Sequence, residues 1–170
     1  PFMRNTAPCI AYANHWVAAK AGDRAHEAAL VVAPAEHLIM DEPGFLETMD
    51  LALSKTRNSG QLVTLGIRPS RPDTGYGYIQ FEEAQGDDDR IRSVRTFTEK
   101  PNLKLAEEFL DSGDFYWNSG IFIWSLANIS EAFESHLPEM QALFHERASS
   151  FATPDEASAI AGASWYSHLF

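Results

Sequence analysis

The 170-residue sequence predicts an α/β fold, built as a mixed, mostly parallel sheet with helices on both faces. Two short aliphatic runs without polar alternation, EAALVVAP at 27–34 and QLVTLGI at 61–67, are typical of strands covered on both faces. Segments with helical spacing of apolar residues alternate with these runs, as in parallel sheets flanked by helices. The chain length fits a single domain, residues 1–170.

Helices are predicted where capping residues frame such segments. Residues 5–22 begin with Asn5 or Thr6 as the N-cap, and residues 44–60 repeat apolar side chains at helical spacing. Residues 101–113 form a third helix, with Asn102 as its N-cap and Gly113 after its last turn. The last third of the chain predicts further helices, broken at Pro138 and near residue 153, with four aromatic residues in their cores: Phe133, Phe144, Trp165 and Tyr166.

A β-hairpin and one further strand complete the predicted sheet. Residues 77–84 and 90–100 flank a turn-prone acidic segment, so they are expected to pair antiparallel. Three carboxylates in that segment, Asp87–Asp89, are interpreted as a solvated turn rather than a metal site. Residues 121–124 (IFIW) indicate a buried strand, and the polar trio Asn118, Ser119 and Gly120 stands at its entrance.

The charge of the chain excludes several kinds of partner. Its 13 basic and 24 acidic residues give a net charge of −11, which argues against binding to nucleic acid or to an anionic membrane surface. The single cysteine, Cys9, allows no intrachain disulfide, which fits a reducing cytoplasm. No apolar run approaches the ~20 residues that a membrane-spanning helix needs. Because the chain is acidic, the binding of a polyanionic ligand would depend on a few placed cations, on backbone N–H groups or on a metal ion.

Polar clusters lie at the ends of the predicted strands, and ligands of α/β sheets bind outside the carboxyl ends of the strands. Glu36 and His37 follow the first strand, and Glu99 and Lys100 end the hairpin's second strand. Between strands, the segment from Gly75 to Tyr78 carries two glycines that would let a ligand approach the backbone. Each cluster also has a simpler interpretation, as a solvated carboxylate beside a packed imidazole, a surface ion pair or a glycine-rich turn.

Taken in order, five motifs resemble one family closely, the mannose-1-phosphate guanylyltransferases, which are also called GDP-mannose pyrophosphorylases. The motifs are RNTAPCIA at 4–11, VVAPAEHLI at 31–39, LVTLGIRPSRPDTGYGYI at 62–79, FTEKP at 97–101 and YWNSGIFIW at 116–124. The resemblance runs from residue 1 to about residue 140. It implies the Rossmann-like, GT-A-like fold of nucleotide-diphospho-sugar transferases, and transfer of a guanylyl group from GTP to mannose 1-phosphate with Mg²⁺, giving GDP-mannose and pyrophosphate.

The resemblance also implies a role for individual residues. Arg4, Asn5 and Thr6 would hold the nucleotide. Mannose 1-phosphate would be bound by a second set, in which Glu99 contacts sugar hydroxyls and Lys100 the phosphate: Gly77, Tyr78, Glu99, Lys100 and Asn118. Lys100 and Glu36 would be the catalytic residues, with Glu36 also the ligand of the Mg²⁺ ion.

The sequence departs from the family in two respects. Glu36 stands where the family usually has Asp, and the longer side chain displaces a ligand of Mg²⁺, which requires strict octahedral geometry. The family's glycine-rich GGxGTRLWP-type loop and first strand are absent, so we expect an internal, truncated piece of a longer enzyme with little or no activity alone. Exposed sheet surface then favours a homo-oligomer. Two alternatives stay open, namely a transferase for another sugar 1-phosphate and a non-catalytic sugar-phosphate or nucleotide-sugar binding paralogue.

Overall fold

The computed structural model describes residues 6–83 and 90–161. Their contacts divide the chain into two compact units. Unit 1 contains the residues up to Val32, Glu36–Val63 and the residues from Ile123 onward, and unit 2 contains Ala33–Ala35 and Thr64–Phe122. The single domain that the sequence predicts stays a prediction.

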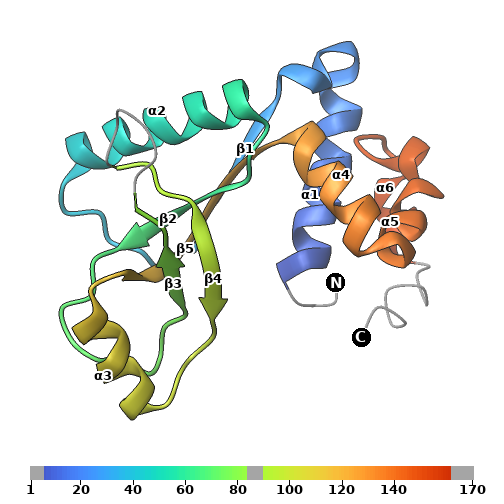
Figure 1. Cartoon of the computed structure of the whole chain (residues 1–170). Helices are drawn as coiled ribbons and strands as arrows, with labels where there is room; N and C mark the ends of the chain where they lie inside the picture. Colours follow the sequence, from blue (N-terminus) through green and yellow to red (C-terminus); the bar gives the residue numbers. More distant parts are fainter. Residues whose placement is uncertain (1–5, 84–89, 162–170) are drawn as a thin grey trace. The chain divides into compact units, whose positions relative to one another are not determined.

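Unit 1 contains a group of helices around α1 (Thr6–Ala21), which packs against α4 (Leu126–His136) and α5 (Pro138–His145) (Figure 1). The short helices η1 (Gly22–Glu27), η2 (Ala148–Ser150) and α6 (Glu156–Ala161) complete the group. Buried apolar side chains form its core, among them Ile10, Ala11, Ile129, Phe133, Met140, Phe144 and Phe151. The predicted core roles of Phe133 and Phe144 are thereby confirmed.

Unit 1 also holds α2 (Glu42–Ser59) and β1 (Ala29–Val32). Helix α2 begins where the Asp41 carboxylate accepts a hydrogen bond from the N–H of Gly44, and it ends at Gly60, whose φ of 68° is left-handed. Strand β1 was predicted to be covered on both faces. Instead its residues are half-buried or exposed, and the Val31 side chain is 45% exposed, because the described chain covers this strand only in part.

The sheet has the order β1-β5-β3-β4, and β2 (Val63–Ile67) pairs with β5 (Phe115–Ser125). Strand β3 (Tyr78–Phe81) lies between β4 (Val94–Thr98) and β5 and runs antiparallel to both. The hairpin that the sequence predicts is therefore confirmed. The expectation that the sheet is mostly parallel is not confirmed, because both of these pairings are antiparallel.

Helix α3 (Leu103–Ser112) belongs to unit 2 and confirms the predicted caps. The Asn102 side chain accepts a hydrogen bond from the N–H of Leu105, and Gly113 adopts a left-handed φ of 77°. The core of the unit forms where this helix meets the sheet, from Tyr78, Ala106, Phe109, Phe115 and Trp117.

Strand β5 is longer than its apolar run, so the polar trio lies within the strand rather than at its entrance. Ser119 is buried, and the cost of burying its hydroxyl is offset by two hydrogen bonds. The hydroxyl donates to the Leu65 carbonyl at 2.7 Å and accepts from the Ile121 N–H at 3.1 Å. Gly120 has a φ of 74°, and a Cβ there would lie 3.1 Å from Cγ of Pro34. Glycine relieves both constraints and permits a local bend in the strand.

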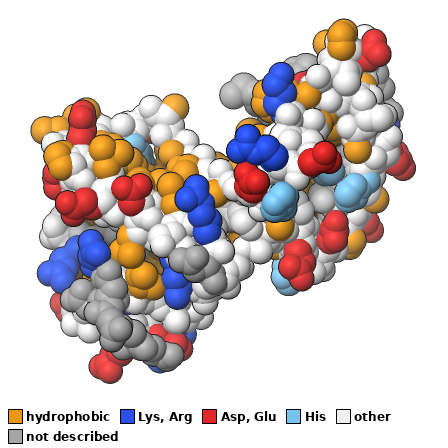
Figure 2. All heavy atoms as spheres, turned by 90° about the horizontal axis from the view of Figure 1, so that it is seen from above, with side chains coloured by type: hydrophobic (Ala, Val, Ile, Leu, Met, Phe, Trp, Pro, Cys, Tyr) orange, Lys and Arg blue, Asp and Glu red, His pale blue; other side chains and the backbone are white. Residues whose placement is uncertain are grey.

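Some of the predicted features lie outside the described residues, namely Arg4, Asn5, Asp87–Asp89, Trp165 and Tyr166. Within the described part of the chain, no helix is long and apolar enough to cross a membrane. Acidic and basic side chains are interspersed on the face shown in Figure 2, and no broad basic surface forms there.

Candidate functional site

Three of the predicted ligand-binding residues meet at one end of the β4-β3-β5 sheet in unit 2. Tyr78 is paired with Thr98 on one side and with Trp117 on the other, so the preceding residue, Gly77, lies beside the end of β4 and beside Asn118 within β5. A Cβ built on Gly77 would lie 2.9 Å from Oε2 of Glu99 and 3.6 Å from Cβ of Asn118. The antiparallel register therefore brings Gly77, Glu99 and Asn118 together.

The carboxamide of Asn118 is oriented by hydrogen bonds to the backbone and side chains around it. Its Oδ1 accepts from the Gly120 N–H at 3.0 Å and lies 3.4 Å from the Thr64 hydroxyl. The Asn118 N–H donates to the Gly77 carbonyl at 2.8 Å. With Oδ1 used in this way, Nδ2 makes no hydrogen bond within the described chain and can donate to a ligand hydroxyl.

Lys100 supplies the positive charge at this end of the sheet. Its Nζ lies 3.5 Å from Oε1 of Glu99, and both side chains are mostly exposed. An exposed pair of this kind contributes little to stability, so both groups can exchange partners at small cost. Lys100 also has a φ of 43°, an uncommon conformation for a residue with a side chain that is often found at functional positions.

Asp73 fixes the loop that leads into Gly77. Its carboxylate accepts from the Gly75 N–H at 2.8 Å and from the Arg71 guanidinium at 2.6 Å. These contacts, the Gly75 bond first, lower the pKa of Asp73 below its ordinary value, although partial desolvation opposes them. The Asp73 carboxylate therefore holds the loop that leads into Gly77 in a folded conformation.

The Tyr78 side chain points away from ligands and into the core. It is fully buried and packs against Phe109, with their ring centroids 5.3 Å apart. Its hydroxyl accepts from the Asp73 N–H at 3.0 Å and donates to the Asp73 carbonyl at 2.9 Å. The predicted role of Tyr78 in substrate binding stays a prediction.

The indole of Trp117 lies beneath the same loop. The Arg71 guanidinium carbon is 5.2 Å from the centre of the Trp117 ring, and the Tyr76 ring centroid is 5.1 Å away. Such cation–π and aromatic contacts stabilise the exposed loop against the sheet. Tyr76, the residue before Gly77, remains 45% exposed despite these contacts.

Two further predicted site residues, Glu36 and Thr6, lie in unit 1. Glu36 is exposed in the turn after β1, next to the exposed His37, and Thr6 is the first residue of α1. Among the described residues, no group of three or more His, Cys, Asp or Glu side chains could hold a metal ion. Glu36 offers a single oxygen-ligand side chain, so these residues alone do not fit an octahedral Mg²⁺ site.

The sequence reasoning missed Arg71, Asp73 and Trp117. The pattern Asp73-Thr74-Gly75 was a usable signal, because an Asp side chain often accepts a hydrogen bond from the N–H two residues later. No local pattern could show that Tyr78 and Trp117 would pack against this loop. Those contacts depend on the strand register.

Residues 1–160 match the family model described as nucleotidyl transferase. The chain belongs to this family. The prediction of an enzyme family of nucleotidyltransferases is thereby confirmed.

Curated relatives of this nucleotidyl transferase chain carry specific names. It is 38% identical over 157 residues to the mannose-1-phosphate guanylyltransferase of Escherichia coli (strain K12), a match that covers 91% of this chain and 32% of that protein. It is also 37% identical over 136 residues to the alginate biosynthesis protein AlgA of Pseudomonas aeruginosa, covering 80% of this chain and 27% of that protein. The chain thus spans less than a third of the length of these relatives.

A solved structure confirms the fold. The structure from Thermus thermophilus, described as a mannose-1-phosphate geranyltransferase, superposes with a TM-score of 0.76 at 29% identity. The match covers 95% of this chain and 44% of that chain. The α/β fold of nucleotide-sugar transferases that the sequence predicts is therefore confirmed.

Proposed function

We propose that this chain forms the sugar 1-phosphate site of a mannose-1-phosphate guanylyltransferase, which joins GTP and mannose 1-phosphate to GDP-mannose and releases pyrophosphate. The observation that carries the proposal is the meeting of Gly77, Glu99 and Asn118 beside the Lys100 ammonium. Membership of the nucleotidyl transferase family supports the reaction type, and the name of the Escherichia coli relative supports mannose and guanine.

Each group at the site suits one part of mannose 1-phosphate. The Glu99 carboxylate can accept hydrogen bonds from sugar hydroxyls, and Asn118 Nδ2 can donate one. The absent side chain at Gly77 leaves the backbone open to the sugar ring. Lys100 holds the phosphate as a point charge and keeps its oxygen aligned for attack on the α-phosphate of GTP.

The nucleotide and the metal complete the proposal. Arg4, Asn5 and Thr6 would contact GTP, and Glu36 would supply one ligand to a Mg²⁺ ion that neutralises the phosphates. Since the described residues lack the remaining ligands, the chain's own catalytic contribution is to bind and orient mannose 1-phosphate. We expect this chemistry in the cytoplasm, with the enzyme as a homo-oligomer.

Titration of the ¹⁵N-labelled 170-residue chain with mannose 1-phosphate tests the proposal. We expect weak, saturable shifts of the backbone amides of Gly77 and Lys100 and of the Asn118 side-chain amide. Glucose 1-phosphate, which differs at one hydroxyl, should bind more weakly. Equal affinity for the two sugars would contradict the mannose assignment, and no shift with either would contradict the site itself.

A further inference from the structure

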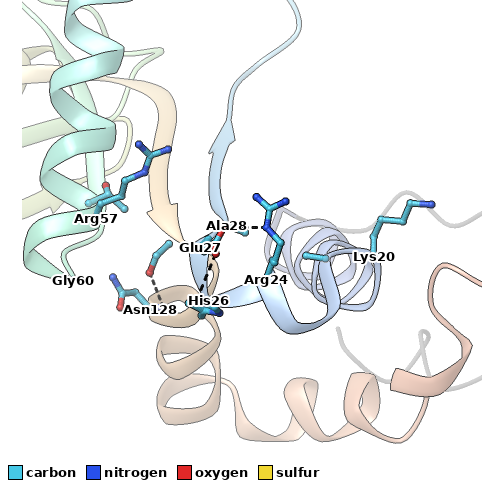
Figure 3. Close-up of a pocket in the computed structure, with 11 residues that line it drawn as sticks. Lys20, Arg24, His26, Glu27, Ala28, Arg57, Gly60 and Asn128 are labelled. Carbon is cyan, nitrogen blue, oxygen red and sulfur yellow. Dashed lines mark hydrogen bonds and ion pairs between the residues drawn. The ribbon is translucent and has the colours of Figure 1, made fainter.

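A pocket of about 820 Å³ lies within unit 1, and its lining shares no residue with the set assigned to the sugar 1-phosphate. It is lined by the end of α1 and η1, by the last turns of α2 and by the start of α4. Figure 3 shows Arg57 on one side of this pocket and Lys20 and Arg24 on the other, with His26 and Glu27 between them. Its volume falls in the range of pockets for small molecules, about 300–1,000 Å³.

The lining of this pocket is cationic although the chain carries a net charge of −11. Among the described residues that line it, Glu27 is the one acidic residue. Its Oε2 already lies 3.1 Å from Nε of Arg24, and its Oε1 lies 3.9 Å from Nε2 of His26. Lys20 and Arg57 form no ion pair or hydrogen bond with any side chain in residues 6–83 and 90–161. Two full positive charges in the lining therefore have no ion-pair partner among the described residues.

Two polar groups of the lining, one in buried Thr56 and one in half-buried Asn128, also lack partners among the described residues. The hydroxyl of Thr56, a residue only 1% exposed, makes no hydrogen bond to a described residue, and neither does Nδ2 of Asn128. An unsatisfied buried donor costs about 1–3 kcal/mol, so buried polar groups in folded proteins are usually hydrogen-bonded. Thr56 belongs to α2 and Asn128 to α4, and both residues line the pocket.

The start of α4 adds backbone polarity to the same wall. Ser125 caps this helix by accepting from the Asn128 N–H at 3.1 Å, and both residues line the pocket. The first turn of an 11-residue helix carries partial positive charge, which favours an anion. Lys20 and Arg57 lie in the last turns of α1 and α2, where a positive charge also stabilises the helix end. That stabilising role does not explain the unpaired groups of Thr56 and Asn128.

We propose that this pocket binds a phosphate-bearing small molecule, held by Arg57 and Lys20 through charge and by Thr56 and Asn128 through hydrogen bonds. The combination of separate cations with neutral donors suits phosphate oxygens, each of which accepts several hydrogen bonds. None of these residues takes part in the proposed binding of mannose 1-phosphate in unit 2. The inference is therefore independent of the proposed function.

Pyrophosphate is the probe for the first experiment, at constant ionic strength with the ¹⁵N-labelled chain. We expect a saturable shift of the Asn128 side-chain amide and of the Gly60 backbone amide. Arg57→Gln should weaken this binding by about fivefold or more, as the loss of a charge-assisted contact predicts. Lys55→Gln is the matched control, because it removes the same charge from the same helix outside the pocket, and it should change the affinity less than about twofold.

Two further variants separate a built site from general attraction of anions. Thr56→Val removes the unpaired hydroxyl without changing charge, so it should weaken pyrophosphate binding while the unfolding midpoint stays equal or rises. Lys100→Gln should leave the shift at Asn128 unchanged. If Arg57→Gln fails to fold, Lys20→Gln at the opposite wall serves the same comparison.

Several results would overturn the proposal. They are a linear, non-saturating shift at Asn128, equal weakening by Lys55→Gln and Arg57→Gln, or loss of the Asn128 shift in Lys100→Gln. Mannose 1-phosphate and GTP, titrated separately, distinguish a sugar phosphate from a nucleotide as the ligand. A saturable Asn128 shift with either one supports the proposal and assigns the class.

Discussion

The hydroxyl of Tyr78 holds both backbone groups of Asp73, accepting from its N–H at 3.0 Å and donating to its carbonyl at 2.9 Å. Because the Tyr78 ring is fully buried, this one side chain ties the loop before Gly77 to the core of unit 2. A residue predicted to bind substrate thus shapes the site from beneath.

Replacing Tyr78 with Phe should loosen this loop while the ring packing persists. We expect the free energy of unfolding to fall by about 1–2 kcal/mol, because two backbone groups lose their partner. Mannose 1-phosphate binding should weaken as well. Tyr116→Phe is the matched control, since the Tyr116 hydroxyl makes no hydrogen bond to the described residues, and denaturant unfolding of both variants checks the difference. Equal stability of the two variants would show that the Tyr78 hydroxyl does not stabilise the loop.

Gly77→Ala tests the closeness of Gly77 and Glu99. The new methyl group would lie 2.9 Å from the Glu99 carboxylate oxygen, which is the mobile end of an exposed side chain. The carboxylate should therefore move aside, leaving the unfolding midpoint nearly unchanged and weakening mannose 1-phosphate binding about tenfold, or ~1.4 kcal/mol. Calorimetric titration and thermal unfolding measure the two effects. Unchanged affinity would show that the sugar does not use this position.

Two substitutions of Asn118 should separate its effect on stability from its effect on binding of mannose 1-phosphate. Asn118→Asp retains an oxygen to accept from the Gly120 N–H, whereas Asn118→Ala does not and should cost about 1 kcal/mol of stability. Both variants lose the Nδ2 donor and should bind mannose 1-phosphate more weakly. Chemical unfolding and ligand titration test both effects. Wild-type affinity in Asn118→Asp would remove Nδ2 from the proposed site.

His15 should make the stability of unit 1 depend on pH. Burial lowers its pKa from 6.5; a hydrogen bond to Gln141 opposes that shift, and the neighbouring His145 adds to it. Its ring stacks on Phe144. Above pH 6.5 both folded and unfolded states hold neutral His15, so stability is full. As the pH falls below that value the unfolded state is protonated first, and stability declines until the lowered folded-state pKa is passed.

His15→Phe should therefore flatten the acid side of a plot of unfolding midpoint against pH, because the aromatic contact remains and the titrating group is gone. His136→Gln, at an exposed position on α4, is the control and should retain the slope. Thermal unfolding at a series of pH values makes the comparison. A slope that survives in His15→Phe would assign the pH dependence to other groups.

The structural elements that depend on residues close together in the sequence could be predicted. Capping by Asn102, the glycine after α3 and the β3-β4 hairpin depend on neighbouring residues, and all three were found where expected. The grouping of Gly77 with Asn118 could be expected only from the family resemblance. No spacing rule connects residues that far apart in the chain.

The length of β5 could not be predicted because the polar trio inside it is satisfied by distant partners. Ser119 reaches the Leu65 carbonyl, and Gly120 accommodates Pro34. The exposure of β1 was missed for a related reason, since an aliphatic run indicates a preference for burial and does not show which neighbours cover it. Burial is a property of the folded chain and its contacts.

Lys100→Gln provides the most direct measurement of the central claim, that the end of the β4-β3-β5 sheet binds mannose 1-phosphate through its phosphate. The experiment compares the affinities of the 170-residue chain and this variant for mannose 1-phosphate and for unphosphorylated mannose. Lys104→Gln, on the exposed face of α3, controls for the loss of one positive charge. We predict that Lys100→Gln removes the preference for the phosphorylated sugar and that Lys104→Gln retains it. An undiminished preference in Lys100→Gln would contradict the claim.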